Sequence, residues 1–139
     1  MLSHVGHIVS DIERSVRFYV DLLGFAYVSE ARFTADQIDD FLKAQPPRSM
    51  HAVYLTLGSF TLELMQLEPG AESDAARRTF NASGLTHLSF ALEDPSAVAM
   101  RAEEFGGTVF SQLGKAFMIR DPDGQFIELL GAPVVPRAG

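Results

Sequence analysis

The chain has 139 residues, of which 47% are hydrophobic and 21% charged, and this composition predicts one globular domain rather than a disordered or fibrous chain. The sequence contains no cysteine, which excludes disulfides, a thiol nucleophile and thiolate metal ligands. The formal net charge of -7 and the lack of any clustered Lys/Arg run argue against nucleic acid and anionic membranes as partners.

A strand at residues 2–9 and a helix after it are the first predicted elements. Ser10 and Glu13 have the spacing of a capping box, and Gly24 stands where a helix commonly ends. A second strand is expected at residues 25–29. Between the two helix ends, apolar residues recur every three or four positions, which predicts one buried helix face: Ile12, Val16, Tyr19, Val20 and Leu23.

The segment "FTADQIDDFLKAQPP", within residues 33–48, predicts a short inserted helix. Thr34 and Gln37 form a second capping box, and the pair Pro46-Pro47 ends the segment. Three apolar residues share one face of this helix: Ile38, Phe41 and Leu42. The strand "FTLELMQL" follows, and the polar, turn-rich residues 68–84 are interpreted as a linker.

The second half of the chain repeats this order of elements. Residues 85–92 predict a strand, Asp94 and Pro95 begin a helix, Gly106-Gly107 end it, and "FIELLG" predicts a last strand. We therefore predict an α+β fold of two βαβββ modules, one at about residues 1–67 and one at about residues 85–132, within a single domain covering residues 1–139.

Neither module contains a segment that suggests a membrane or an export route. No apolar run approaches the ~20 residues that span a membrane, and no basic segment followed by an apolar one stands at the N-terminus. We therefore expect a cytoplasmic protein.

The two modules share a register and a pair of chemically active residues. His4 precedes Asp11 by seven residues, and His87 precedes Asp94 by the same number. Each module also ends in a strand with one glutamate among apolar residues, Glu63 in the first and Glu128 in the second. The interval from histidine to glutamate is 59 residues in the first module and 41 in the second, a difference of about the length of the inserted segment.

His7 lies three residues after His4 in the same predicted strand. Side chains alternate between the two faces of a strand, so at most one of these histidines reaches a given site. The repeat selects His4, because His87 is its counterpart, whereas the counterpart of His7 is Phe90. We interpret His7 as an ordinary packed histidine, which is the commoner role of an isolated histidine on a strand.

The two glutamates need a partner if they are buried. Each is flanked by leucine, isoleucine or methionine, and an uncompensated buried carboxylate destabilises a fold strongly. A divalent cation shared by two carboxylates and two neutral imidazoles offsets that cost. We therefore predict that His4, Glu63, His87 and Glu128 bind one metal ion.

Five segments in order resemble the vicinal oxygen chelate superfamily: "HVGHIVSD", "IERSVRFYVDLLGF", "TLELMQ", "THLSFALED" and "DPDGQFIELLG". This superfamily groups glyoxalase I, methylmalonyl-CoA epimerase, type I extradiol dioxygenases, fosfomycin-resistance proteins and bleomycin-type drug-binding proteins. The resemblance covers nearly the whole chain. It implies a cupped mixed sheet of paired modules, a Zn, Ni, Co, Mn or Fe ion inside the cup, a small-molecule substrate, and a homodimer in most members.

The branch of the superfamily is indicated by a few positions. A glutamate at position 63 resembles glyoxalase I, whereas the fosfomycin-resistance and extradiol branches use two histidines and one glutamate. The opening "SHVGHIVSDIE" is instead similar to methylmalonyl-CoA epimerases. Ile8 and Leu67 stand where glyoxalase I has polar residues, Ile8 in place of an arginine for a glutathione carboxylate, which argues against glutathione recognition. Four phenylalanines either line the cup or belong to the core: Phe60, Phe90, Phe117 and Phe126.

The resemblance implies a metal-dependent isomerase, lyase or epimerase. In such an enzyme two adjacent substrate oxygens bind the metal, and Glu63 or Glu128 transfers a proton through an enediolate. One alternative is a metal-free protein that sequesters a hydrophobic or aromatic compound, as drug-resistance members do. A third interpretation is an Fe(II) extradiol dioxygenase.

Overall fold

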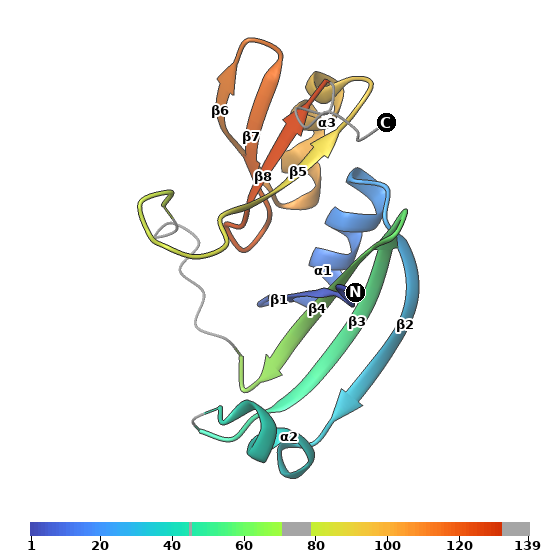
Figure 1. Ribbon diagram of the computed structural model, residues 1–139, viewed down its shortest axis with the longest axis vertical. Helices are drawn as coiled ribbons and strands as arrows, with labels where there is room; N and C mark the ends of the chain where they lie inside the picture. The colour runs from blue at the N-terminus through green and yellow to red at the C-terminus, as the bar shows by residue number, and fades with distance from the viewer. Residues whose placement is uncertain (45, 71–78, 132–139) are drawn as a thin grey trace. The chain divides into compact units, whose positions relative to one another are not determined.

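The same order of elements occurs in both halves of the chain: a strand, a helix and three further strands (Figure 1). The structure is a computed structural model that describes residues 1–44, 46–70 and 79–131. The chain divides into two units, Met1–Ser73 and Asp74–Gly139, and each unit contains one of the predicted modules. The predicted α+β fold of two βαβββ modules is confirmed.

The first module is a four-stranded mixed sheet in the order β1-β4-β3-β2. β1 and β4 are parallel, and the other neighbouring strands are antiparallel. Its elements are β1 (Val5–Ile8), α1 (Ile12–Arg17) continued by the π-helix η1 (Phe18–Leu22), β2 (Ala26–Phe33), α2 (Ala35–Leu42), β3 (Ser49–Leu57) and β4 (Phe60–Glu68).

The second module has the same topology, in the order β5-β8-β7-β6 with β5 and β8 parallel. It has no counterpart of α2 among its described residues. Its elements are β5 (His87–Ala91), α3 (Pro95–Arg101) continued by the 3-10 helix η3 (Ala102–Phe105), β6 (Thr108–Leu113), β7 (Ala116–Arg120) and β8 (Phe126–Leu130).

The start of α1 differs from the predicted capping box of Ser10 and Glu13, which is wrong. Asp11 is the N-cap, and its carboxylate accepts a hydrogen bond of 3.0 Å from the backbone N–H of Arg14. The Ser10 hydroxyl instead accepts a 3.0 Å hydrogen bond from the Arg14 guanidinium. Asp and Ser are comparably good N-cap residues. Here Asp11 caps the helix, and the Ser10 hydroxyl is bound by the Arg14 side chain instead.

The other predicted helix starts and the end at Gly24 are confirmed, whereas α2 ends at Leu42, with Lys43 at a left-handed φ of 52°, before the predicted stop at Pro46-Pro47. The backbone N–H of Thr34 donates to the Gln37 side chain at 2.8 Å at the start of α2. The Asp94 carboxylate accepts from the backbone N–H of Ala97 at 3.0 Å at the start of α3. After η1, Gly24 has a φ of 82°, a left-handed conformation that glycine adopts without strain.

The two faces of the first sheet are covered by different helices. α1 packs on the face that includes Leu62 and Leu64, which are 1% and 0% exposed, and Gln66 on the same face accepts a 2.7 Å hydrogen bond from the backbone N–H of Ile12. α2 packs on the opposite face, where Ile38 contacts a buried cluster with Met50. The inserted helix therefore covers part of the face that α1 leaves open.

The expected linker at residues 68–84 lies partly outside the described residues, at positions 71–78. The last residue of β4 is Glu68 and the first of β5 is His87. No helix in the described ranges is long and apolar enough to cross a membrane.

The Asp94→Ala substitution tests the N-cap of α3. Removing the carboxylate leaves the backbone N–H of Ala97 without its partner, so we expect the free energy of unfolding to fall by about 1 kcal/mol in urea denaturation. Asp94→Asn keeps an acceptor at the same place and is the matched control. An equal loss in both variants would show that the charge, and not the cap, stabilises the helix.

Candidate functional site

In the first module, His4 and Glu63 lie side by side although 59 residues separate them. The parallel pairing of β1 with β4 sets Gly6 opposite Glu63, and His4 precedes Gly6 by two residues, on the same face. The distance from His4 Nε2 to Glu63 Oε2 is 3.1 Å. The His4 side chain is 40% exposed and the Glu63 side chain 10% exposed, so the imidazole forms the accessible part of the pair.

Tyr54 is the third member of this group. It stands directly opposite Glu63 in the antiparallel β3–β4 pair, and its hydroxyl donates a 2.7 Å hydrogen bond to Glu63 Oε1. The ring of His4 meets the ring of Tyr54 edge-on at 6.1 Å. The hydrogen bond to the Glu63 carboxylate, with burial as a second cause, raises the pKa of Tyr54 above its usual 10.0. Both oxygens of Glu63 therefore have a partner.

The second module brings His87 and Glu128 together in the same way. β5 and β8 are parallel, and the distance from His87 Nε2 to Glu128 Oε2 is 3.6 Å. The hydroxyl of Ser89 donates a 2.7 Å hydrogen bond to the same oxygen. No described residue contacts Glu128 Oε1. With side chains 33% and 31% exposed, this pair is more open to solvent than Glu63, which differs from the burial expected for both glutamates.

A hydroxyl group contacts the other ring nitrogen of each histidine. Ser3 Oγ lies 3.1 Å from His4 Nδ1, and Thr86 Oγ1 lies 2.8 Å from His87 Nδ1. A hydroxyl that accepts from Nδ1–H leaves the Nε2 lone pair for a metal, and metal-binding histidines commonly have such a partner. The geometry at both imidazoles thus suits coordination through Nε2.

His7 lies on the other face of β1, as strand alternation predicts. Its ring meets the ring of Tyr19 in η1 edge-on at 6.2 Å. Tyr19 is fully buried beneath the sheet. His7 therefore packs against the helix side of the first module, away from the Glu63 face.

The hydroxyl group that donates a hydrogen bond to the glutamate carboxylate comes from a different strand in each module, from β3 in the first and from β5 in the second. Ser89 follows His87 by two residues, and the matching position after His4 is Gly6. A Cβ atom on Gly6 would come within 2.8 Å of the Met65 methyl group and 3.9 Å of Glu63 Oε2. The absence of a side chain at Gly6 thus lets the Met65 methyl group pack against the backbone there, next to the Glu63 carboxylate.

An aromatic cluster surrounds an arginine on the Glu128 face of the second sheet. The Arg120 guanidinium carbon lies 4.7 Å from the ring centre of Phe110 and 4.9 Å from that of Phe126. The Phe80 ring lies 4.6 Å from the Phe126 ring and 5.7 Å from the His87 ring. This module therefore presents aromatic and cationic groups beside its histidine.

Of the four phenylalanines that either line the cup or form the core, Phe126 lies on the Glu128 face. Phe117 pairs with Leu129, which is 0% exposed, and Phe90 aligns with the same leucine. Phe60 packs edge-on against Phe25 in the first module, with ring centres 6.3 Å apart. Of the four, Phe90 and Phe126 are buried, and Phe60 and Phe117 are half-buried.

The turn between β7 and β8 contacts the two segments that carry Glu128 and His87. The Asp121 carboxylate, on a residue 3% exposed, accepts from the backbone N–H groups of Asp123 and Gln125 at 2.9 and 2.8 Å. The Gln125 side chain donates a 2.7 Å hydrogen bond to the Thr86 carbonyl oxygen. The segment "DPDGQ" thus links the start of the glutamate strand to the residue that precedes His87.

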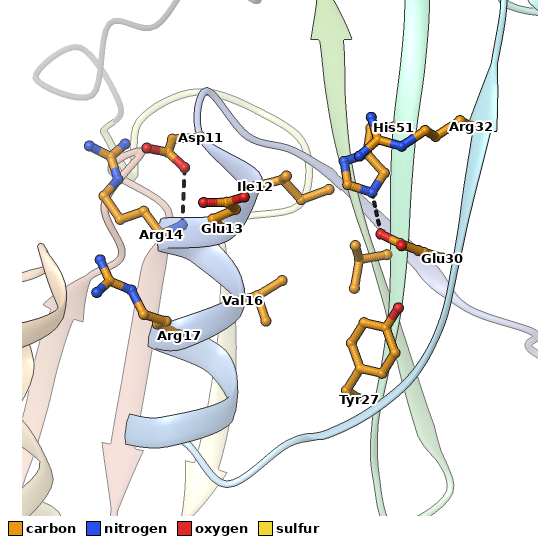
Figure 2. A pocket seen from close by; sticks show the side chains of 11 residues that line it. Asp11, Ile12, Glu13, Arg14, Val16, Arg17, Tyr27, Glu30, Arg32 and His51 are labelled. Carbon is orange, nitrogen blue, oxygen red and sulfur yellow. Dashed lines mark hydrogen bonds and ion pairs between the residues drawn. The ribbon is translucent and has the colours of Figure 1, made fainter.

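A pocket of about 630 Å³ lies on the α1 side of the first sheet, between that helix and strands β2 and β3 (Figure 2). Figure 2 shows Ile12 and Val16 pointing from α1 toward the strands. Across the pocket wall formed by the strands, His51 Nε2 lies 2.7 Å from Glu30 Oε2. None of the four predicted metal ligands lines this pocket.

The structure thus brings the four predicted ligands together as two pairs, one in each module. The described residues include no group of three or more histidine, aspartate or glutamate side chains placed to hold a metal ion. The sequence interpretation missed the four hydroxyl groups of Ser3, Tyr54, Thr86 and Ser89. A hydroxyl residue before each histidine, in "SH" and "TH", is a signal that identifies Ser3 and Thr86.

Comparisons with known proteins identify the family of the chain. A profile of the Glyoxalase/Bleomycin resistance protein/Dioxygenase superfamily matches residues 1–129. The chain is 30% identical over 138 residues to the glutathione transferase FosA of Serratia marcescens, covering 92% of this chain and 78% of that protein.

Solved structures show the same fold. A glyoxalase family protein from Bacillus cereus superimposes with a TM-score of 0.77 at 18% identity, covering 92% of this chain and 91% of that one. A variant of the fosfomycin resistance protein FosX from Listeria monocytogenes, in complex with Mn(II) and 1S,2S-dihydroxypropylphosphonic acid, has a TM-score of 0.65 at 16% identity, covering 96% and 93%.

The hydrogen bond between Tyr54 and Glu63 predicts a pH dependence in the metal-free protein. The bond favours the neutral phenol, so its contribution to the free energy of unfolding is complete below pH 10.0 and is lost as the pH rises through the raised pKa of Tyr54. Tyrosinate absorbance recorded against pH, compared between the wild type and Tyr54→Phe, gives this pKa. Glu63→Gln should lower it, and Tyr27→Phe should leave it unchanged. A Tyr54 pKa that does not respond to Glu63→Gln would contradict the assignment.

Proposed function

The chain belongs to the Glyoxalase/Bleomycin resistance protein/Dioxygenase superfamily, and from that premise we propose that it is a divalent-metal-dependent isomerase, lyase or epimerase. Its substrate is a small molecule with two adjacent oxygens, on which the enzyme transfers a proton. The superfamily includes glyoxalase I and the fosfomycin-resistance enzymes, and the relative FosA is itself an enzyme. One observation carries the proposal: both modules set a histidine Nε2 against a glutamate oxygen, at 3.1 and 3.6 Å.

The donor atoms fit a divalent transition metal. His4 and His87 provide two imidazole nitrogens, and Glu63 and Glu128 provide two carboxylates whose charge balances that of the cation. A set of two nitrogens and two oxygens without sulfur suits Zn, Ni, Co, Mn or Fe. The hydroxyl groups at both Nδ1 atoms are the outer partners that such ligands require. We propose that the two pairs together hold one ion per chain, whether the modules pair within one chain or across a dimer.

The two glutamates have different roles in this proposal. A cation bound here supplies electrophilic stabilisation to the two substrate oxygens and so favours loss of a proton from the adjoining carbon. Glu128 accepts that proton at Oε1, the atom with no partner among the described residues, and returns it to the substrate. Glu63 is held at Oε1 by the Tyr54 hydroxyl, which leaves Oε2, 3.1 Å from His4 Nε2, for the metal, and Glu63 acts as a fixed ligand.

A second candidate function is a transferase reaction like that of FosA. The 30% identity to the Serratia glutathione transferase over 92% of the chain favours it. A glutamate at position 63 and the apolar Ile8 and Leu67 favour the proton-transfer reaction instead. Incubation with Mn(II), glutathione and fosfomycin, followed by 31P NMR, distinguishes the two, because the transferase gives a glutathione adduct.

Metal analysis of the purified, untagged protein tests the site itself. We expect close to one equivalent of transition metal per chain after reconstitution. His4→Ala should lose the metal, because it removes a ligand, and His7→Ala should retain it, because His7 packs against Tyr19 on the other face. Elemental analysis measures both. Protein that holds no metal after reconstitution supports the metal-free binding protein instead, and oxygen uptake by the Fe(II) form supports a dioxygenase.

Exchange of a carbon-bound proton with solvent tests the reaction. We expect the metal-loaded protein to exchange the proton beside the oxygens of a 2-hydroxyketone probe such as dihydroxyacetone, measured by 1H NMR in D2O. Glu128→Gln should slow this exchange by about 10²-fold or more, since it removes the general base. Glu103→Gln, on exposed η3, is the matched control. Undiminished exchange in Glu128→Gln, with loss in Glu63→Gln, would assign the base to Glu63, and undiminished exchange in both would refute the mechanism.

A further inference from the structure

The Glu63 face of the first sheet consists of rows of side chains that run across its strands. Strand register defines the first row, in which Glu63 has Gly6 on one side and Tyr54 on the other, and Ser29 stands next to Tyr54. This row carries the carboxylate and the phenol, and the Met65 methyl group packs against Gly6. It is the polar row of the face.

The second row is apolar from edge to edge. Ile8 aligns with Met65, Met65 with Ala52, and Ala52 with Ala31. Ile8 is 40% exposed, Met65 is half-buried and Ala52 is fully buried. Because residues two apart along a strand are separated by roughly 6.6 Å, this row lies directly beside the carboxylate row.

The third row is also apolar, and α2 stands on it. Leu67 aligns with Met50, and Met50 with Phe33. Ile38 of α2 packs with Met50 of this row and with Ala52 of the second row, so the helix also covers the middle of the second row; Ile38 and Met50 are each 8% exposed. All residues of the second and third rows are described, and none is charged. The helix therefore forms the end wall of an apolar strip that begins at Glu63.

The charged side chains of the same strands point the other way. Glu30 and Arg32 of β2 align with Val53 and His51 of β3, on the face that α1 covers. Alternation along β2 and β3 thus separates charge from apolar surface. A substrate bound at Glu63 meets no charged group of this module between the carboxylate and α2.

We propose that this strip binds the non-reacting part of the substrate, and that the substrate carries an uncharged alkyl or aryl substituent beside its two oxygens. This inference rests on the proposed function, because the oxygens are placed by the metal ligands. The substituent covers Met65 and Ile8 and ends against α2, so the inserted helix limits its length. An anionic substituent would instead need a cationic partner. Such a group, Arg120, lies on the Glu128 face of the second module and not on the strip.

A series of hydroxamic acids tests the strip without knowledge of the natural substrate, because a hydroxamate offers two adjacent oxygens to a metal. Titration calorimetry of the Zn-loaded protein with aceto-, butano-, hexano- and octanohydroxamate gives Kd against chain length. We expect Kd to fall by up to about fourfold per methylene for the shorter chains and to level off when the chain reaches α2. A matched probe that has the length of octanohydroxamate but ends in a carboxylate should bind more weakly than octanohydroxamate does.

Two variants locate the effect. Met65→Gln should flatten the dependence of Kd on chain length while leaving acetohydroxamate binding unchanged, and Met100→Gln, at an 80% exposed position on α3, is the matched control. Ile8→Lys places a charge in the second row at a 40% exposed position, where folding is not at risk, and should weaken octanohydroxamate most.

The outcomes separate this inference from the proposed function. Tight acetohydroxamate binding with no dependence on chain length, or a preference for the carboxylate-ended probe, would overturn the apolar strip and leave the metal centre intact. Chain-length dependence that is unaffected by Met65→Gln and Ile8→Lys would also overturn it. Chain-length dependence that is sensitive to both variants and persists without Zn would support the strip and refute the metal centre.

Discussion

The parallel pairing of the first and last strands in each module is the constraint on which the candidate site depends. Parallel neighbours cannot be joined by a tight turn, so a helix and two further strands must lie between them. This connection brings His4 beside Glu63 and His87 beside Glu128, residues far apart in the sequence. The strands that complete the connection then supply the remaining groups, such as the Tyr54 hydroxyl on β3.

A buried carboxylate such as Glu63 is stable only with compensation. Its neighbours along β4 are Leu62 and Leu64, which pack in the core, and its own side chain is 10% exposed. Hydrogen bonds to a charged group contribute roughly 1.5–3 kcal/mol each, which offsets part of the desolvation. Tyr54 therefore has a structural role, because its hydrogen bond compensates the Glu63 carboxylate and fixes its position.

Much of this arrangement could be predicted from sequence because it is local or repeated. The caps at Thr34 and Asp94 depend on residues three positions apart, and the matching intervals to Asp11 and Asp94 identify His4 over His7. Tyr54 could not be predicted, since its contact with Glu63 depends on the register of the β3–β4 hairpin. The greater exposure of Glu128 follows from packing around the strand, which its apolar flanks do not determine.

The unequal hydroxyl positions in the two modules break the internal symmetry of the duplicated fold. Gly6 and Ser89 occupy matching positions, yet Ser89 carries the hydroxyl in the second module while Tyr54 on β3 carries it in the first. One carboxylate therefore accepts its hydrogen bond from a phenol and the other from an aliphatic hydroxyl, so the two glutamates of the duplicated fold are not chemically equivalent.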